Sequence, residues 1–231
     1  MSSAARLPSQ VPAPAGVPAP GAPDDLDPLL TEWAAGRRFH RCYDVSWGSR
    51  DFYAGDDAHP GRFHPFIPHG GTEPLPVLYG ADDFDGAVFE TVFHDVPIRG
   101  VKRVPHAKLV HRLVVVLAPT RTLTLVDLTT EGLRRLELEP SELTTCGPRT
   151  YPDTAAWARA LHAHAENIDG LLWVSRQHNT SVALVLFGDR VTVDDLEVAA
   201  DEVPLTLGIG RGLDLVAAAA ARVGITITGL V

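Results

Sequence analysis

Short apolar runs rich in Val, Leu and Ile recur along the chain, and polar or turn-forming residues separate them. Runs of this length predict β-strands that are buried within a sheet. The predicted strands cover 39–43, 76–80, 109–117, 122–128, 170–174, 182–187 and 224–231.

Apolar residues with helical spacing occur between these strands. The spacing within 29–33 predicts a helical turn at the start of the fold. Asp82 or Asp83 is placed to cap a helix over 84–94. Further helices are predicted at 154–165, 193–200 and 213–223. Because strands dominate and helices lie between them, the pattern predicts a mixed, strand-rich α+β domain.

Residues 1–28 have a different composition from the rest of the chain. Seven of the 19 prolines fall there, among many Ala, Gly and Ser residues. Proline removes backbone donors and the small side chains bury little area, so this segment is predicted to be a disordered, Pro/Ala-rich tail. The tail is interpreted either as a docking segment for a partner or as a passive extension. Residues 29–231 are predicted to form one domain.

Composition and charge narrow the classes of function. The formal net charge of −9 argues against non-specific binding to nucleic acid and against docking on an anionic membrane. Cys42 and Cys146 are the two cysteines, and they lack the spacing of a CxxC motif. No apolar stretch approaches the roughly 18 residues of a spanning helix, and no secretion signal begins the chain. A cytoplasmic protein is expected, with its oligomeric state, including a homo-oligomer, left open.

Five short segments place charged or aromatic residues beside glycine or within apolar surroundings. They read FHRCY at 39–43, GRFHP at 61–65, VLYGA at 77–81, AVFET at 87–91 and WVSR at 173–176. Arg41 and Arg62 carry planar guanidinium groups that match phosphate oxygens, although Arg41 is also explained as a partner of Asp44. Ionised Glu90 is costly to bury within apolar residues unless it has a partner or a function. The alternative is that Glu90 occupies the wet stripe of an amphipathic helix.

In this order, the segments resemble the RES domain, a family named for an Arg, a Glu and a Ser. The three name residues correspond to Arg41, Glu90 and Ser175. Tyr79 stands 11 residues ahead of Glu90, as the active-site tyrosine of the family does, and Arg62 corresponds to its second arginine. His64 replaces the asparagine that is usual at its position. The resemblance spans 38–190.

The resemblance implies an enzyme that breaks the nicotinamide–ribose bond of NAD⁺ and a fold like that of ADP-ribosyltransferase toxins. NAD⁺ is then the substrate, and neither a metal nor another cofactor is expected. Similar proteins are toxins of toxin–antitoxin pairs, so an Xre-type antitoxin is the implied protein partner. The acceptor stays open between water, phosphate and a protein side chain, the last being protein ADP-ribosylation.

Each candidate residue receives a role in that chemistry. Glu90 stabilises positive charge that develops on the ribose. The two arginines hold the pyrophosphate, and the Tyr79 ring stacks on the nicotinamide or ribose. Ser175 donates a hydrogen bond to the substrate. The remaining substrate-binding candidates are Phe63 and His64.

Two further classes of function are compatible with the sequence. A metal-dependent hydrolase would need His59, His64, His69 and His94 to converge, and the H-E-x-x-H spacing is absent. A non-catalytic interaction domain is the other alternative. The G-x-G-x-G run at 208–212 departs from the dinucleotide-binding spacing and is interpreted as a turn and helix cap.

Overall fold

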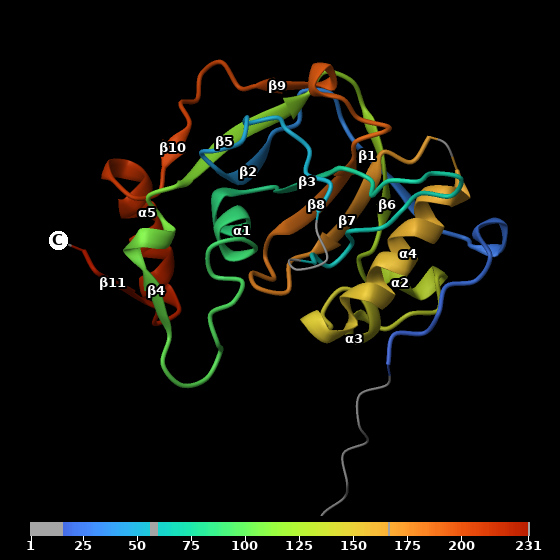
Figure 1. The fold of residues 1–231 in the computed structure, drawn as a ribbon, viewed down its shortest axis with the longest axis horizontal. Coiled ribbons are helices and arrows are strands. Elements are labelled where there is room, and N and C mark those ends of the chain that lie inside the picture. The colour runs from blue at the N-terminus through green and yellow to red at the C-terminus, as the bar shows by residue number, and fades with distance from the viewer. Residues whose placement is uncertain (1–15, 56–59, 166, 231) are drawn as a thin grey trace, which may run out of the picture.

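A curled, nine-stranded β-sheet organises the chain in this computed structural model, which describes residues 16–55, 60–165 and 167–230 (Figure 1). The strand order is β1-β6-β7-β8-β3-β2-β5-β10, and β9 pairs with β5. The strands are β1 Leu30–Trp33, β2 Phe39–Asp44, β3 Val77–Ala81, β5 Arg112–Pro119, β6 Leu123–Asp127, β7 Gly170–Val174, β8 Val182–Phe187, β9 Leu196–Val198 and β10 Leu205–Thr206. A separate parallel pair joins β4 (Arg103–Pro105) and β11 (Thr226–Thr228).

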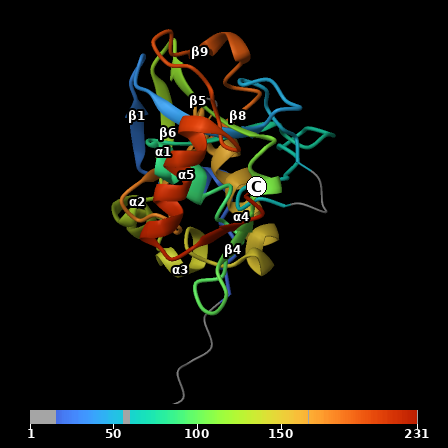
Figure 2. The same ribbon diagram turned by 90° about the vertical axis from the view of Figure 1, so that its left-hand side faces the viewer.

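Five helices pack around the sheet. They are α1 Phe84–Phe89, α2 Thr130–Arg135, α3 Pro140–Leu143, α4 Tyr151–His164 and α5 Gly210–Arg222. The group α2, α3 and α4 lies on one side of the molecule, and α5 lies with β4 and β11 on the other (Figures 1 and 2). The prediction of a strand-rich α+β fold is confirmed.

The central strands are buried on both faces. Along β7, Leu171 packs in the cluster that includes α4, whereas the next residue, Leu172, packs in a second cluster on the opposite face with Trp33 and Phe39. A strand buried on both faces has no polar face, which explains the continuous apolar runs that predicted β7 and β8 from sequence. A third cluster joins α1, β5 and α5 through residues such as Val88 and Val216.

Three sequence predictions are wrong in detail. The segment 29–33 forms strand β1, because Leu30 to Trp33 pair antiparallel with β6. An apolar run this short fits the hydrophobic period of a helix and that of a strand equally well. The predicted helix at 193–200 is a 3₁₀ turn, Val193–Asp195, followed by β9. Helix α1 ends at Phe89, five residues before the predicted end at 94, although Asp83 caps it as expected.

The structure also revises part of the predicted tail, of which residues 1–15 lie outside the described ranges. The carbonyl of Pro18 accepts a 2.7 Å hydrogen bond from the Trp157 indole, and the carbonyl of Pro23 lies 2.8 Å from His164 Nδ1. Val17 and Leu26 pack against the core cluster around α4. The described part of the segment is therefore packed against α4, because prolines still offer carbonyls to donors on the helix.

None of the helices in the described ranges has the length and apolar character needed to cross a membrane.

The buried carboxylate of Asp169, the residue before β7, connects the start of β7 to β6. Asp169 is buried, and both of its oxygens accept hydrogen bonds from Arg121, at 3.0 and 2.7 Å. The backbone N–H of Thr124 donates a third, at 2.8 Å. Arg121 also donates hydrogen bonds to the carboxylate of Asp195 and to the carbonyl of Arg190. The Arg121–Asp169 ion pair therefore connects segments that are distant in the sequence.

Asp169→Ala is expected to lower the free energy of unfolding by about 2–3 kcal/mol, because it leaves the Thr124 N–H without its acceptor and removes two hydrogen bonds of Arg121. Urea denaturation followed by circular dichroism measures the change. The control is Asp201→Ala, which removes an exposed ion pair with Arg38 and should not move the midpoint. Equal midpoints for the two variants would contradict the assignment.

Candidate active site

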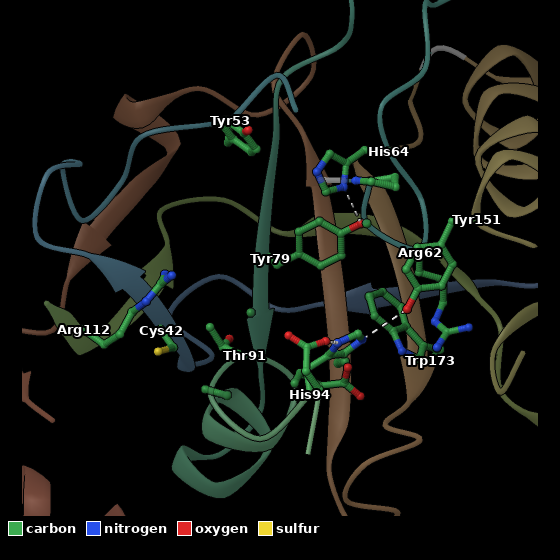
Figure 3. Close-up of a pocket in the computed structure, with 17 residues that line it drawn as sticks. Cys42, Tyr53, Arg62, His64, Tyr79, Thr91, His94, Arg112, Tyr151 and Trp173 are labelled. Atoms are coloured by element: carbon green, nitrogen blue, oxygen red, sulfur yellow. Dashed lines mark hydrogen bonds and ion pairs between the residues drawn. The ribbon is translucent and has the colours of Figure 1, made fainter. Parts of the chain in front are cut away.

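Two adjoining cavities open beside β2, β3 and the end of α1, with volumes of about 390 and 490 Å³. We call them the main cavity and the side cavity. The main cavity contains Arg62, His64, Glu90, His94, Tyr151 and Trp173 (Figure 3). The side cavity contains Arg41, Tyr43, Asp44, Ser46 and Trp47. Both are lined by Cys42, Tyr53, Tyr79 and Arg112, so together they can hold an extended ligand.

Glu90 stands at the end of α1, where the helix stops and the backbone turns. It is the C-cap residue, and its N–H still bonds to the carbonyl of Gly86. Its Oε1 accepts a 2.6 Å hydrogen bond from the hydroxyl of Ser175. The wet-stripe interpretation does not describe this carboxylate, which is partly buried at the cavity wall and oriented by a neighbour.

Ser175 lies behind Glu90, away from the cavity surface. Its side chain is 1% exposed, and its Oγ accepts a 2.9 Å hydrogen bond from the N–H of His178. The hydroxyl is therefore committed to Glu90. The expectation that Ser175 donates directly to a substrate is corrected: it orients the carboxylate instead.

The loop between β7 and β8 holds α1 at both ends. While Ser175 binds Glu90 at one end, Ser181 donates to the Asp83 carboxylate, at 2.8 Å, at the other. A Cβ on Gly86 would come within 2.7 Å of the Ser181 Cβ. Gly86 therefore makes room for this loop, and Ala87 is the small residue that faces the main cavity.

Tyr79 connects β3 to the segment that carries the Gly-Arg-Phe-His motif. The hydroxyl oxygen of Tyr79 accepts a 3.2 Å hydrogen bond from the N–H of Phe63 and lies 2.9 Å from His64 Nδ1. Burial raises the pKa of Tyr79 above its ordinary value, so the hydroxyl stays protonated. Tyr79 lines both cavities.

Phe63 does not have the predicted substrate contact. Its ring is fully buried and packs edge-on against Trp173, with centroids 5.0 Å apart. Only its backbone N–H serves the site, through Tyr79. An aromatic residue beside Arg62 is needed here for the core, since Phe63 belongs to the buried apolar cluster around α4.

The two predicted arginines line different cavities. Arg62 is buried in the main cavity, where it donates to the carbonyls of Leu143 and Cys146 at 3.3 and 3.0 Å. Arg41 is buried at the side cavity and donates to the carbonyl of Ser49 at 3.1 Å. Burial lowers the pKa of Arg41 to about 10, which still leaves it cationic at neutral pH.

Arg112 is a site residue that the sequence analysis missed. It lines both cavities, and its Nε lies 3.9 Å from the carboxylate of Asp44. The partner predicted for Arg41 is therefore held by Arg112. Its only sequence signal is a place within the predicted strand 109–117, and the pairing of β5 with β2 brings it opposite Asp44.

Tyr151 was also missed, and His94 was considered only as a metal ligand. They reach the main cavity from the start of α4 and from the segment after α1, and His94 Nε2 lies 3.1 Å from the Tyr151 hydroxyl (Figure 3). The sequence gives no signal that relates positions so far apart.

Of the histidines considered for a metal site, two share a cavity in the described part of the chain. His64 and His94 line the main cavity, whereas His69 is exposed and His59 lies outside the described residues. Among the residues that the structure describes, no group of three or more His, Cys, Asp or Glu is arranged to hold a metal ion.

Comparison with known proteins identifies the family and a structure of similar fold. The sequence model of the RES domain matches residues 34–208. A chain in the crystal structure of the M. tuberculosis MbcT–MbcA toxin–antitoxin complex is similar in fold, with a TM-score of 0.54 and 19% sequence identity. The alignment covers 77% of this chain and 87% of that chain. No curated protein matches the sequence.

Gly61→Ala is expected to destabilise the site, because the added Cβ would lie 2.3 Å from Cε1 of His64 and push its ring away from Tyr79. Overpacking of this kind costs about 1–3 kcal/mol of unfolding free energy, which urea denaturation measures. Gly147→Ala is the matched control, since no atom lies within 4 Å of its Cβ position. Wild-type stability in Gly61→Ala would show that this packing is not needed.

Proposed function

The chain belongs to the RES-domain family, and we propose that it cleaves the nicotinamide–ribose bond of NAD⁺ as the toxin of a toxin–antitoxin pair. The observation that carries the proposal is the Glu90 carboxylate. Ser175 fixes it at the wall of a cavity that also contains arginine and aromatic side chains. The family resemblance supplies the substrate, and the arrangement of these groups supports the reaction.

Glu90 is suited to stabilise the reacting sugar. Nicotinamide leaves as a neutral molecule from a cationic nitrogen, so the departure needs no general acid. The ribose gains oxocarbenium character as the bond lengthens, as in glycoside cleavage. A carboxylate held in place before the reaction stabilises this charge without reorganising, and the gain is larger in the transition state than in the ground state.

The other charged and aromatic groups match different parts of the dinucleotide. Arg41 and Arg112 present guanidinium groups at the side cavity, where the pyrophosphate would lie. Tyr79 and Trp173 offer aromatic surfaces in the main cavity beside Glu90, where the nicotinamide ring would lie. Arg62, with one nitrogen bonded to backbone carbonyls, mainly fixes the wall of that cavity.

The proposal concerns the bond that breaks. Water, phosphate and a protein side chain are the candidate acceptors, and the product formed beside nicotinamide identifies which is used. We place the reaction in the cytoplasm, where NAD⁺ is available.

A protein partner is part of the proposal. The similar structure is described as a toxin–antitoxin complex, which supports an antitoxin for this chain as well. The family resemblance makes an Xre-type antitoxin the first candidate.

Glu90→Gln should lower the rate of nicotinamide release from NAD⁺ by about 10²–10³-fold, the usual effect of removing one preorganised electrostatic group. The purified proteins are incubated with NAD⁺, with and without phosphate, and nicotinamide is measured by chromatography. Asp85→Asn is the matched control, since this α1 carboxylate pairs with Arg222 and does not line the cavities.

Failure of the wild-type protein to release nicotinamide under these conditions, and also when a cell lysate supplies protein acceptors, would overturn the proposed reaction. Expression of the two variants in cells tests the toxin role. Growth arrest by wild type and Asp85→Asn, but not by Glu90→Gln, is the expected pattern.

Arg41→Ala should weaken the use of NAD⁺ more than the use of nicotinamide riboside, which lacks the pyrophosphate. A lost charged hydrogen bond of about 1.5–3 kcal/mol predicts that kcat/KM for NAD⁺ falls about 10–100-fold. Arg38→Ala, three positions earlier on an exposed ion pair, is the control. Equal losses for both substrates would show that Arg41 does not contact the pyrophosphate.

A further inference from the structure

Three hydrogen-bonded side chains, Asp95, His94 and Tyr151, line the main cavity and have no role in the chemistry described above. The Asp95 carboxylate lies 2.9 Å from Nδ1 of His94. Nε2 of the same ring lies 3.1 Å from the Tyr151 hydroxyl (Figure 3). We call this row the tyrosine relay.

The chemistry of the three groups fixes the positions of the protons. An ionised carboxylate only accepts, so Nδ1 of His94 carries the hydrogen that faces Asp95. In the neutral imidazole, Nε2 then has a lone pair and accepts the hydrogen of the Tyr151 hydroxyl. Burial raises the pKa of Tyr151, so that hydroxyl keeps its proton. The hydroxyl oxygen therefore presents acceptor lone pairs to a ligand in the cavity.

The relay is held in place from several sides. The Tyr151 side chain is buried, its ring lies 5.4 Å from the Arg62 guanidinium, and its carbonyl accepts a hydrogen bond from Thr154. Arg62 is itself fixed by the loop that precedes α4. The carbonyl of His94 accepts a 3.1 Å hydrogen bond from Gln177. A site held in this way can discriminate between ligands, since its groups do not readily rearrange to suit another one.

We propose that the Tyr151 hydroxyl oxygen, oriented by His94 and Asp95, accepts a hydrogen bond from the carboxamide N–H of the nicotinamide ring and so selects the amide over the acid form of the dinucleotide. This inference rests on the proposed function. The nicotinic acid ring carries a carboxylate, which has no hydrogen to donate. Its oxygens would face the lone pairs of the Tyr151 hydroxyl oxygen, so the acid form cannot make this hydrogen bond.

The test compares kcat/KM for NAD⁺ and for nicotinic acid adenine dinucleotide. A site built to pair with a donor rejects an analogue that lacks it, so the wild-type protein should prefer NAD⁺ by about 100-fold or more. Tyr151→Phe removes the acceptor and should reduce this preference about 10-fold or more. The control Arg38→Ala should keep the wild-type ratio. The inference is overturned if the NAD⁺ preference of Tyr151→Phe stays within about two-fold of the wild-type preference. A change that small is well below the effect of one lost hydrogen bond.

Asp95→Asn gives a second and independent measurement. An asparagine amide can donate to Nδ1, which moves the ring hydrogen to Nε2 and turns the Tyr151 hydrogen toward the cavity. The preference for the amide should therefore fall, although Tyr151 is still present. Asp95 is 78% exposed, so this variant should fold even if Tyr151→Phe does not. An unchanged ratio in Asp95→Asn would contradict the role of the relay.

Failure of the proposed function and failure of the selection by Tyr151 give different results. If the wild-type protein cleaves neither dinucleotide, the proposed function fails, and the inference is then tested by binding of free nicotinamide and free nicotinate in calorimetry. Tighter binding of nicotinamide by wild type, lost in Asp95→Asn, supports selection of the amide. Equal binding of the two compounds, or a preference unchanged in Asp95→Asn, overturns it.

Discussion

The hydrogen bond from Ser175 to Glu90 joins the loop between β7 and β8 to the end of α1, and the geometry of the site depends on it. A short helix such as α1 is not stable alone, because few of its backbone groups bond to one another. Here Asp83 caps its first turn and binds Ser181, while Glu90 at its end binds Ser175. The same loop thus fixes both the helix and the direction of the carboxylate that the proposed chemistry uses.

Three other buried polar groups in the site follow the same rule, since each is held by a partner from another segment. Tyr79 is held by the N–H of Phe63, Arg62 by the carbonyls before α4, and Arg41 by the carbonyl of Ser49. Groups fixed in this way lose little entropy when a ligand binds. The site is consequently assembled by the fold before any ligand arrives.

Several positions carry more than one function, and this limits what they can tolerate. Arg62 lines the cavity, yet it also anchors the loop that delivers Tyr151. Gly61 is small because the ring of His64 occupies the space of a side chain, and Gly86 is small because Ser181 does. Arg62, which the sequence marks as a ligand contact, is therefore partly structural. The glycines, which are structural, define where a ligand fits.

The sequence by itself determined the central strands β2, β3, β7 and β8 and the family, and it singled out Glu90 as a candidate, because periodicity and local motifs are written in neighbouring residues. It misassigned β1, because four residues fit a strand or a helical turn equally well and only pairing with β6 decides. The tertiary structure alone decided that Ser175 faces Glu90, that Phe63 belongs to the core, and that Arg112, His94 and Tyr151 share the cavities. These are contacts between distant segments. They depend on how the sheet curls and which strands become neighbours, information that no local pattern of residues contains.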